Sequence, residues 1–126
     1  MTDSSCPFCN VEKTRVVEKN EFVVVLLDGY PVTNGHALIV PRRHVASPQD
    51  LSQVESALSF DAARRYCSKA RRDDPSILGF NIGYNDGEAA GQTVFHAHLH
   101  VIPRRQGDVE KPRGGIRNII PGKGSW

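Results

Sequence analysis

Three histidines alternate with apolar residues in the last third of the chain: His96, His98 and His100. Successive side chains of a strand point to opposite faces, so this alternation predicts that the three imidazoles share one face. Imidazole titrates near neutral pH and can act as a nucleophile, a proton acceptor or a metal ligand. In a strand, the first and third rings would be about 13 Å apart, too far for one ion to bind all three. The histidines must therefore divide their roles.

A loop that contains glycine, Asn85 to Val94, leads directly into the histidines. Gly91 permits a close approach of the backbone to a ligand, while the Thr93 hydroxyl and the Val94 amide can donate to phosphate oxygens. Asn85 and Gln92 can donate from their side-chain amides to bridging oxygens or to a ribose. The loop therefore predicts a site for an anionic ligand beside the histidine row.

These segments together resemble the histidine triad (HIT) superfamily. Residues 96–102 match its motif of histidines alternating with apolar residues, and residues 85–94 are similar to the segment that precedes the motif. Asp28 and the segment Gly35 to Pro41, with His36, fall where the family has its other site residues. The resemblance covers roughly residues 6–105. It implies a single HIT domain over residues 1–126, with a C-terminal loop or tail over residues 106–126.

The activity implied by the resemblance is hydrolysis of an AMP-X or dinucleoside polyphosphate bond, as in the Fhit-like diadenosine polyphosphate hydrolases and bacterial HIT proteins. His98 would form a nucleotidyl-imidazole intermediate that water resolves, and His100 would contact the α-phosphate. His36 would buttress His98 or share protons with it, and Asp28 would accept hydrogen bonds from the ribose. The catalytic motif also includes His96, and no cofactor is implied for catalysis. The family's purine-nucleotide pocket would use Phe8, Val11, Leu26 and Leu27.

Near the N-terminus, Cys6-Pro7-Phe8-Cys9 forms a CxxC pair. By itself this spacing leaves open a redox pair, half of a zinc site or a reduced pair without metal. Some HIT proteins, and the related galactose-1-phosphate uridylyltransferases, bind structural zinc through such a pair, a distant histidine and the first triad histidine. The resemblance therefore implies zinc ligands at Cys6, Cys9, His44 and His96. Cys67 is expected to be a small apolar core residue of a helix.

Three other functions stay open. A phosphoramidate hydrolase of the Hint type would use the same nucleophile and pocket, and the tail over residues 107–126, which can close over the leaving group, would separate the two. A metal-dependent hydrolase could use His98 and His100 as ligands, with Asp86 and Glu88 as the nearest carboxylates. A module that binds nucleotide without turnover is the third.

The elements that position these residues can be read from the apolar pattern. Strands are predicted at residues 16–17, 22–27, 36–40, 77–83 and 94–102, with an ordered surface loop from Pro103. A helix start is predicted at residues 47–50, and the helix should end at residues 73–75. Its core face is predicted to carry Leu51, Val54, Leu58, Ala62, Tyr66 and Ala70. The expected fold is α+β, HIT-like: an antiparallel sheet of about five strands with one long helix and a short N-terminal helix.

Composition bounds the remaining possibilities. The 126 residues are 39% hydrophobic and carry a formal net charge of +2, too small to indicate nucleic-acid binding. The longest apolar run, residues 22–27, is too short to span a membrane, and residues 1–5 lack the features of a signal peptide. Three cysteines fit a reducing compartment, so we expect a cytoplasmic protein. By analogy with the family, we expect a homodimer.

Overall fold

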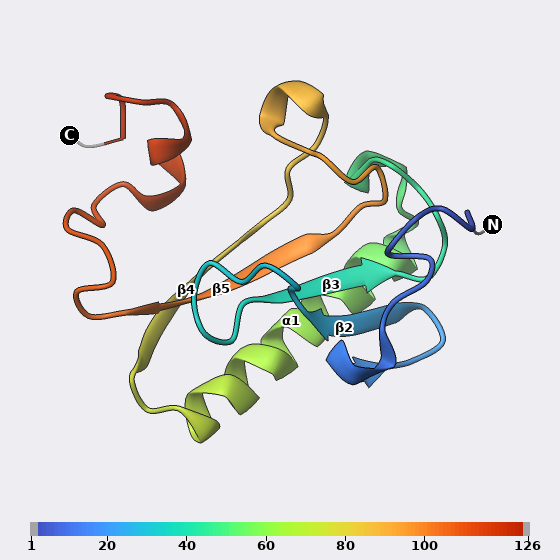
Figure 1. Ribbon diagram of the computed structural model, residues 1–126, viewed down its shortest axis with the longest axis horizontal. Helices are drawn as coiled ribbons and strands as arrows, with labels where there is room; N and C mark the ends of the chain where they lie inside the picture. The colour runs from blue at the N-terminus through green and yellow to red at the C-terminus, as the bar shows by residue number, and fades with distance from the viewer. Residues whose placement is uncertain (1–2, 125–126) are drawn as a thin grey trace.

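One long helix packs on a five-stranded antiparallel sheet in the computed structural model, which describes residues 3–124 (Figure 1). The strand order is β1-β2-β3-β5-β4, and every neighbouring pair is antiparallel. This confirms the predicted α+β fold. The elements are β1 (Val16–Lys19), β2 (Val23–Leu27), β3 (Ala37–Pro41), α1 (Gln53–Asp73), β4 (Ile77–Gly83) and β5 (Leu99–Arg105). The short N-terminal helix is a single 3-10 turn, Lys13–Arg15 (η1).

Strands β2 and β3 are apolar throughout, and both faces of the sheet are covered there. One set of alternate side chains, which includes Val25 and Ile39, packs with Ala62 and Tyr66 of α1. The opposite set, which includes Leu26 and Leu38, packs with side chains of the N-terminal segment. Burial on both faces is the environment that a continuous apolar run predicts.

Helix α1 begins one turn later than the sequence predicted. Ser47 caps a separate 3-10 turn, Pro48–Asp50 (η2), whereas Ser52 forms a capping box with Glu55 at the true start of α1. Both serines have a carboxylate three residues later, so the sequence offers two possible starts, and tertiary packing selects the second.

The core face of α1 also differs from the expectation at its first turns. Val54 is 51% exposed, while the polar Glu55 and Ser59 are buried. Burial of these polar groups is compensated by hydrogen bonds. Arg43 binds the Glu55 carboxylate through two nitrogens at 3.0 and 2.7 Å, and the Ser59 hydroxyl donates to the Glu55 carbonyl at 2.7 Å.

Strand β5 is shifted towards the C-terminus relative to the prediction. Residues 94–98 lie outside the ladder, and the strand continues past Pro103 to Arg105. The prolyl nitrogen cannot donate to a ladder, but β3 pairs with β5 only over residues 99–101. Pro103 is therefore tolerated, and His96 and His98 precede the strand rather than lying on it.

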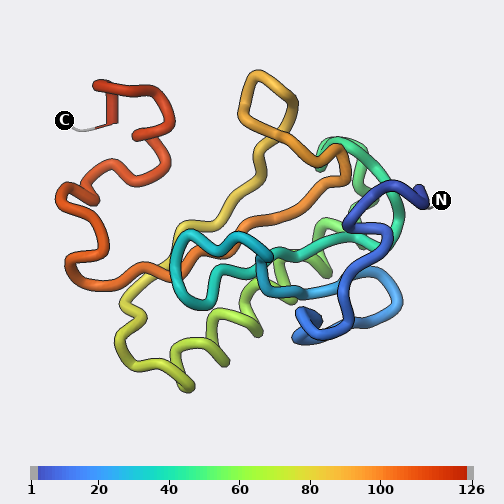
Figure 2. The backbone as a smooth tube through the Cα atoms, viewed as in Figure 1, coloured from blue at the N-terminus to red at the C-terminus, as the bar shows by residue number. Residues whose placement is uncertain are grey.

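The N-terminal segment runs beside the loop before α1 and the loop before β5, as the tube in Figure 2 shows. The C-terminal segment leaves β5 and turns back at a 3-10 helix, Gly115–Ile119 (η4). Residues 125–126 of the expected tail lie outside the described part of the chain. Within residues 3–124, no helix has the length and apolar character required to cross a bilayer.

Candidate active site and metal centre

A pocket of about 290 Å³ lies beside His98 and His100 on the sheet face opposite α1. Three separate segments form its walls: the N-terminal segment, the loop after β2 and the loop before β5. Of the residues expected to bind substrate, the pocket is lined by Phe8, Asp28, Asn85, Gly91, Thr93 and Val94. The phenyl ring of Phe8 lies 4.8 Å from the His98 ring, centroid to centroid.

The hydrogen bond that His98 makes to the backbone determines its tautomer. Its Nδ1 lies 2.8 Å from the carbonyl oxygen of His96, and a carbonyl can only accept. Nδ1 therefore carries the proton of the neutral ring, and Nε2 retains its lone pair. His98 is 9% exposed, and this burial lowers the pKa of its imidazole, which favours the neutral form.

A second chain of hydrogen bonds sets the opposite tautomer in His100. The backbone N–H of Val32 donates to Nδ1 of His36 at 3.1 Å, so the neutral His36 ring carries its proton on Nε2. That nitrogen lies 3.0 Å from Nδ1 of His100 and 3.4 Å from a carboxylate oxygen of Asp28. His100 accepts at Nδ1 and therefore keeps a proton on Nε2. His36 therefore contacts His100 directly, and among residues 3–124 the His100 ring lies between His36 and His98.

Burial also keeps His36 and His100 neutral. Desolvation lowers the pKa of His36, and it lowers the pKa of His100 to about 4, aided by the neighbouring His98 and His36 rings. The carboxylate of Asp28 opposes this by a smaller effect. At neutral pH the pocket thus presents one unprotonated nitrogen, on His98, and one N–H donor, on His100.

Gln92 supports the loop and does not line the pocket. It is buried, its side-chain oxygen accepts from the Gly87 N–H at 2.8 Å, and its side-chain nitrogen donates to the carbonyls of Ala46 and Val94. These bonds use the amide that was expected to bind a ligand. Gly91 at the end of the turn has a φ of +95°, which glycine adopts without a steric penalty.

Three of the apolar residues expected around a base lie outside the pocket. Val11 and Leu26 pack in the core layer beneath the N-terminal segment, and Leu27 is 40% exposed at the end of β2. Sequence reasoning missed Arg15, which lines the pocket and whose guanidinium donates to the Leu27 carbonyl at 3.2 Å. It also missed Tyr30. Neither residue belongs to a motif, so no pattern in the sequence marks them.

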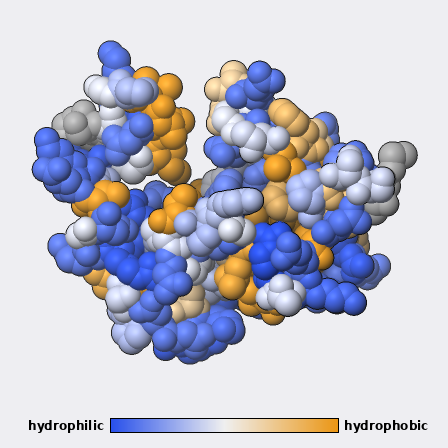
Figure 3. All heavy atoms as spheres, in the orientation of Figure 1, coloured by the Kyte–Doolittle hydropathy of each residue, from blue (hydrophilic) through white to orange (hydrophobic). Residues whose placement is uncertain are grey.

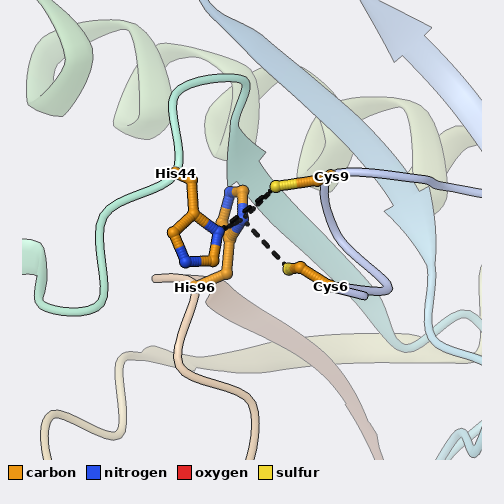
Figure 4. Close-up of side chains that lie close together, drawn as sticks. All are labelled: Cys6, Cys9, His44 and His96. Carbon is orange, nitrogen blue, oxygen red and sulfur yellow. Dashed lines mark hydrogen bonds between the residues drawn. The ribbon is translucent and has the colours of Figure 1, made fainter. Parts of the chain in front are cut away.

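Cys6, Cys9, His44 and His96 point towards one another (Figure 4). Nδ1 of His96 lies 3.4 and 3.5 Å from the two sulfurs, the two Nδ1 atoms are 3.1 Å apart, and Nδ1 of His44 lies 3.2 Å from Cys9 Sγ. Around a tetrahedral zinc ion, two nitrogens would be about 3.3 Å apart, and a nitrogen and a sulfur about 3.6 Å. The donor set and its spacing therefore fit a closed zinc site.

The tautomer of His96 also suits a metal ligand. Its Nε2 donates to the Pro41 carbonyl at 2.7 Å, which leaves the lone pair on Nδ1, inside the cluster. His96 is fully buried there, whereas His98 and His100 line the pocket. His96 therefore faces the cysteine cluster while His98 and His100 face the pocket, although only His100 lies on β5.

The alternative metal-dependent hydrolase receives less support from the arrangement. Within residues 3–124, the second group of potential ligands is Asp28, His36 and His100. It does not include His98, and neither Asp86 nor Glu88 joins either group. His98 is instead held through its Nδ1–H, as described above.

Comparison with known proteins agrees with this geometry. A family model described as the HIT domain matches residues 10–107. The chain is 35% identical over 104 residues to "Protein hit" of Bacillus subtilis, which covers 79% of this chain and 71% of that protein. A zinc-bound histidine triad family protein from Mycobacterium smegmatis is 38% identical, with a TM-score of 0.76, over 82% of this chain and 78% of that one.

A third similarity is to a protein with a stated activity. The diadenosine triphosphate hydrolase of Plasmodium falciparum is 25% identical, with a TM-score of 0.68, over 80% of this chain and 68% of that chain. The family model, the curated relatives and the solved structures therefore agree with the histidine motif. The chain belongs to the HIT domain family.

Proposed function

We propose that this chain is a nucleotide hydrolase that cleaves AMP-X or dinucleoside polyphosphate bonds and releases a nucleoside monophosphate. The observation that carries the proposal is the hydrogen bond from His98 Nδ1 to the His96 carbonyl, because it leaves Nε2 as a nucleophile inside the pocket. A neutral imidazole needs no separate base to attack an anhydride phosphorus.

In the first step, Nε2 of His98 attacks the α-phosphorus. The P–N bond forms, the bond from phosphorus to the bridging oxygen breaks, and the leaving group keeps the electron pair. The cationic ring that results is stabilised by its Nδ1–H bond to the His96 carbonyl. His100 donates its Nε2–H to a non-bridging oxygen, since His36 occupies its Nδ1.

In the second step, a water oxygen bonds to phosphorus while the P–N bond breaks and its electrons return to His98. The water loses one proton to solvent, and the products are the nucleoside monophosphate and the original neutral ring. For the nucleoside, Asp28 accepts from the ribose hydroxyls, and Phe8 packs against the purine. Both residues line the same pocket as His98, which supports this assignment.

The proposal includes a structural zinc ion held by Cys6, Cys9, His44 and His96. Four protein ligands close a site to substrate, so the ion would cross-link the N-terminal segment to the triad and take no part in catalysis. The cross-link matters for the pocket because Phe8 lies between the two cysteine ligands in sequence and contacts His98.

A homodimer is also proposed, through the free edge of β4. Six of the seven residues of β4 pair with β5 on one side, and the other side has no strand partner within the described chain. An unpaired edge of this length is a ready surface for a second copy of the sheet.

A quenched reaction on the wild type and on His98→Gly tests the hydrolase. With ³²P-labelled AMP phosphoramidate or diadenosine triphosphate, we expect acid-labile AMP bound to the wild-type protein and none on the variant. Ser68→Gly, an exposed change on α1, is the matched control and should behave as the wild type does. Turnover of His98→Gly within tenfold of the wild type would refute the nucleophile. AMP binding without release from any substrate would instead identify a binding module.

A further inference from the structure

Arg15 is the one lysine or arginine among the described residues that line the pocket beside His98 and His100. It ends the 3-10 turn η1, directly before β1. The C-terminal segment contributes no described residue to this lining and stands apart from the body of the molecule across a notch (Figure 3). Among the described residues, a ligand in this pocket therefore meets one permanent cation, the guanidinium of Arg15.

The guanidinium of Arg15 lies against the backbone on both sides of Asp28. Its Nη1 donates to the Leu27 carbonyl at 3.2 Å, and a Cβ added to Gly29 would lie only 2.9 Å from the same nitrogen. Gly29 therefore leaves the space that the guanidinium occupies. The Asp28 carboxylate in turn lies 3.4 Å from His36 Nε2, at the edge of the histidine cluster. A nucleotide with its phosphate at the histidines and its ribose at Asp28 therefore extends its base towards Arg15.

The donors of this guanidinium are largely unused. Nε of Arg15 is buried without a hydrogen-bond partner, and Nη2 makes no hydrogen bond within residues 3–124. The carboxylate of Glu12 is 3.9 Å from Nε, beyond hydrogen-bond range, and its side chain is 73% exposed. Nη2 keeps both of its hydrogens and Nη1 keeps one, so the side chain can donate to two acceptors at once. Desolvated donors without acceptors cost free energy, which favours a ligand that supplies acceptors here.

We propose that Arg15 recognises the base and makes the pocket prefer 6-oxopurine nucleotides, those of guanine and hypoxanthine, over adenine nucleotides. The inference rests on the proposed function, which places the phosphate and the ribose. Guanine presents two acceptors, O6 and N7, on one edge, and arginine donates to both. Adenine presents N7 beside an amino group, so one of the two N–H donors would face another donor. A site that donates two hydrogen bonds disfavours the base that accepts only one.

Equilibrium binding of GMP, IMP and AMP tests the inference without hydrolysis. GMP and IMP share the O6 and N7 acceptors, and only guanine has a 2-amino group, so IMP isolates the edge that Arg15 reads. By calorimetry we expect GMP and IMP to bind the wild type about tenfold more tightly than AMP. This value is in the lower part of the range for an arginine–guanine pair, because the Arg15 side chain is 24% exposed.

Arg15→Met keeps an unbranched apolar stem and removes every donor, so its three dissociation constants should agree within about twofold. Arg72→Met, an exposed change on α1, is the matched control and should keep the wild-type preference. Thermal unfolding should show both variants folded.

The same preference should appear in hydrolysis. Guanosine and adenosine 5′-phosphoramidates release the same ammonia and differ only in the base, so wild-type kcat/KM should be about tenfold higher for the guanosine compound. The inference is overturned if AMP binds the wild type as tightly as GMP, if IMP binds like AMP, or if Arg15→Met keeps the wild-type preference. A protein that shows the binding preference but hydrolyses neither phosphoramidate would refute the hydrolase and leave the recognition of the base standing.

Discussion

The buried carboxylate of Glu55 should stabilise the fold through Arg43, and Glu55→Gln measures that contribution. Arg43 binds both carboxylate oxygens, and the Glu55 side chain is only 6% exposed. This pairing lowers the pKa of Glu55 from 4.5 to about 2. Glutamine can still complete the capping box with Ser52, so the substitution removes the charge and retains the cap.

The magnitude follows from the pKa. A folded pKa of about 2 against 4.5 in the unfolded chain corresponds to at most about 3 kcal/mol at neutral pH. The Arg43 side chain is 46% exposed, so solvent screening reduces the expected value to about 2 kcal/mol. Because the pKa is lowered on folding, the contribution is complete above pH 4.5 and is lost as the pH falls towards 2. By pH 3, more than half of it should be gone.

Urea unfolding of the wild type and Glu55→Gln at pH 7 and pH 3 provides the assay. The matched control is Glu18→Gln, which breaks an exposed pair with Arg65 and should cost less than 1 kcal/mol. The reasoning fails if Glu55→Gln costs no more than the control at pH 7. It also fails if the loss caused by Glu55→Gln is undiminished at pH 3.

Two further predictions concern the metal centre and the triad. Purified wild type should contain one equivalent of zinc by atomic emission, and Cys9→Ser should contain less than a fifth of that amount. The control Cys67→Ser lies outside the cluster and should retain its zinc. Equal zinc contents in the two variants would contradict the site. The second prediction concerns His100, because burial lowers the pKa of its ring to about 4. Between pH 6.5 and pH 4 the unfolded chain therefore binds more protons than the folded chain. The contribution of this ring should lower the free energy of unfolding by up to about 1.4 kcal/mol for each pH unit of acidification. His100→Asn should lose less stability between pH 7 and pH 5 in urea unfolding, and an identical loss would refute a neutral, half-buried ring.

Much of the architecture could be predicted because local patterns and packing agree. The apolar runs at β2 and β3 and the amphipathic spacing of α1 gave a sheet and one long helix, as observed. Element ends were less accurate. Two serine caps compete at the start of α1, and Pro103 gave an apparent strand end in β5. In both places the outcome depends on distant partners, which a local pattern does not contain.

The candidate site divides in the same way. The histidine spacing and the CxxC pair determined which residue types could do chemistry, and that three rings in a row could not share one ion. Only the tertiary structure decided the partner of each ring, because the Pro41 and His96 carbonyls and the Val32 N–H select the tautomers. Arg15 likewise reaches the pocket from a segment remote in sequence from the histidines, brought there by packing. Residue type thus sets the available chemistry, and the folded backbone sets which nitrogen performs it.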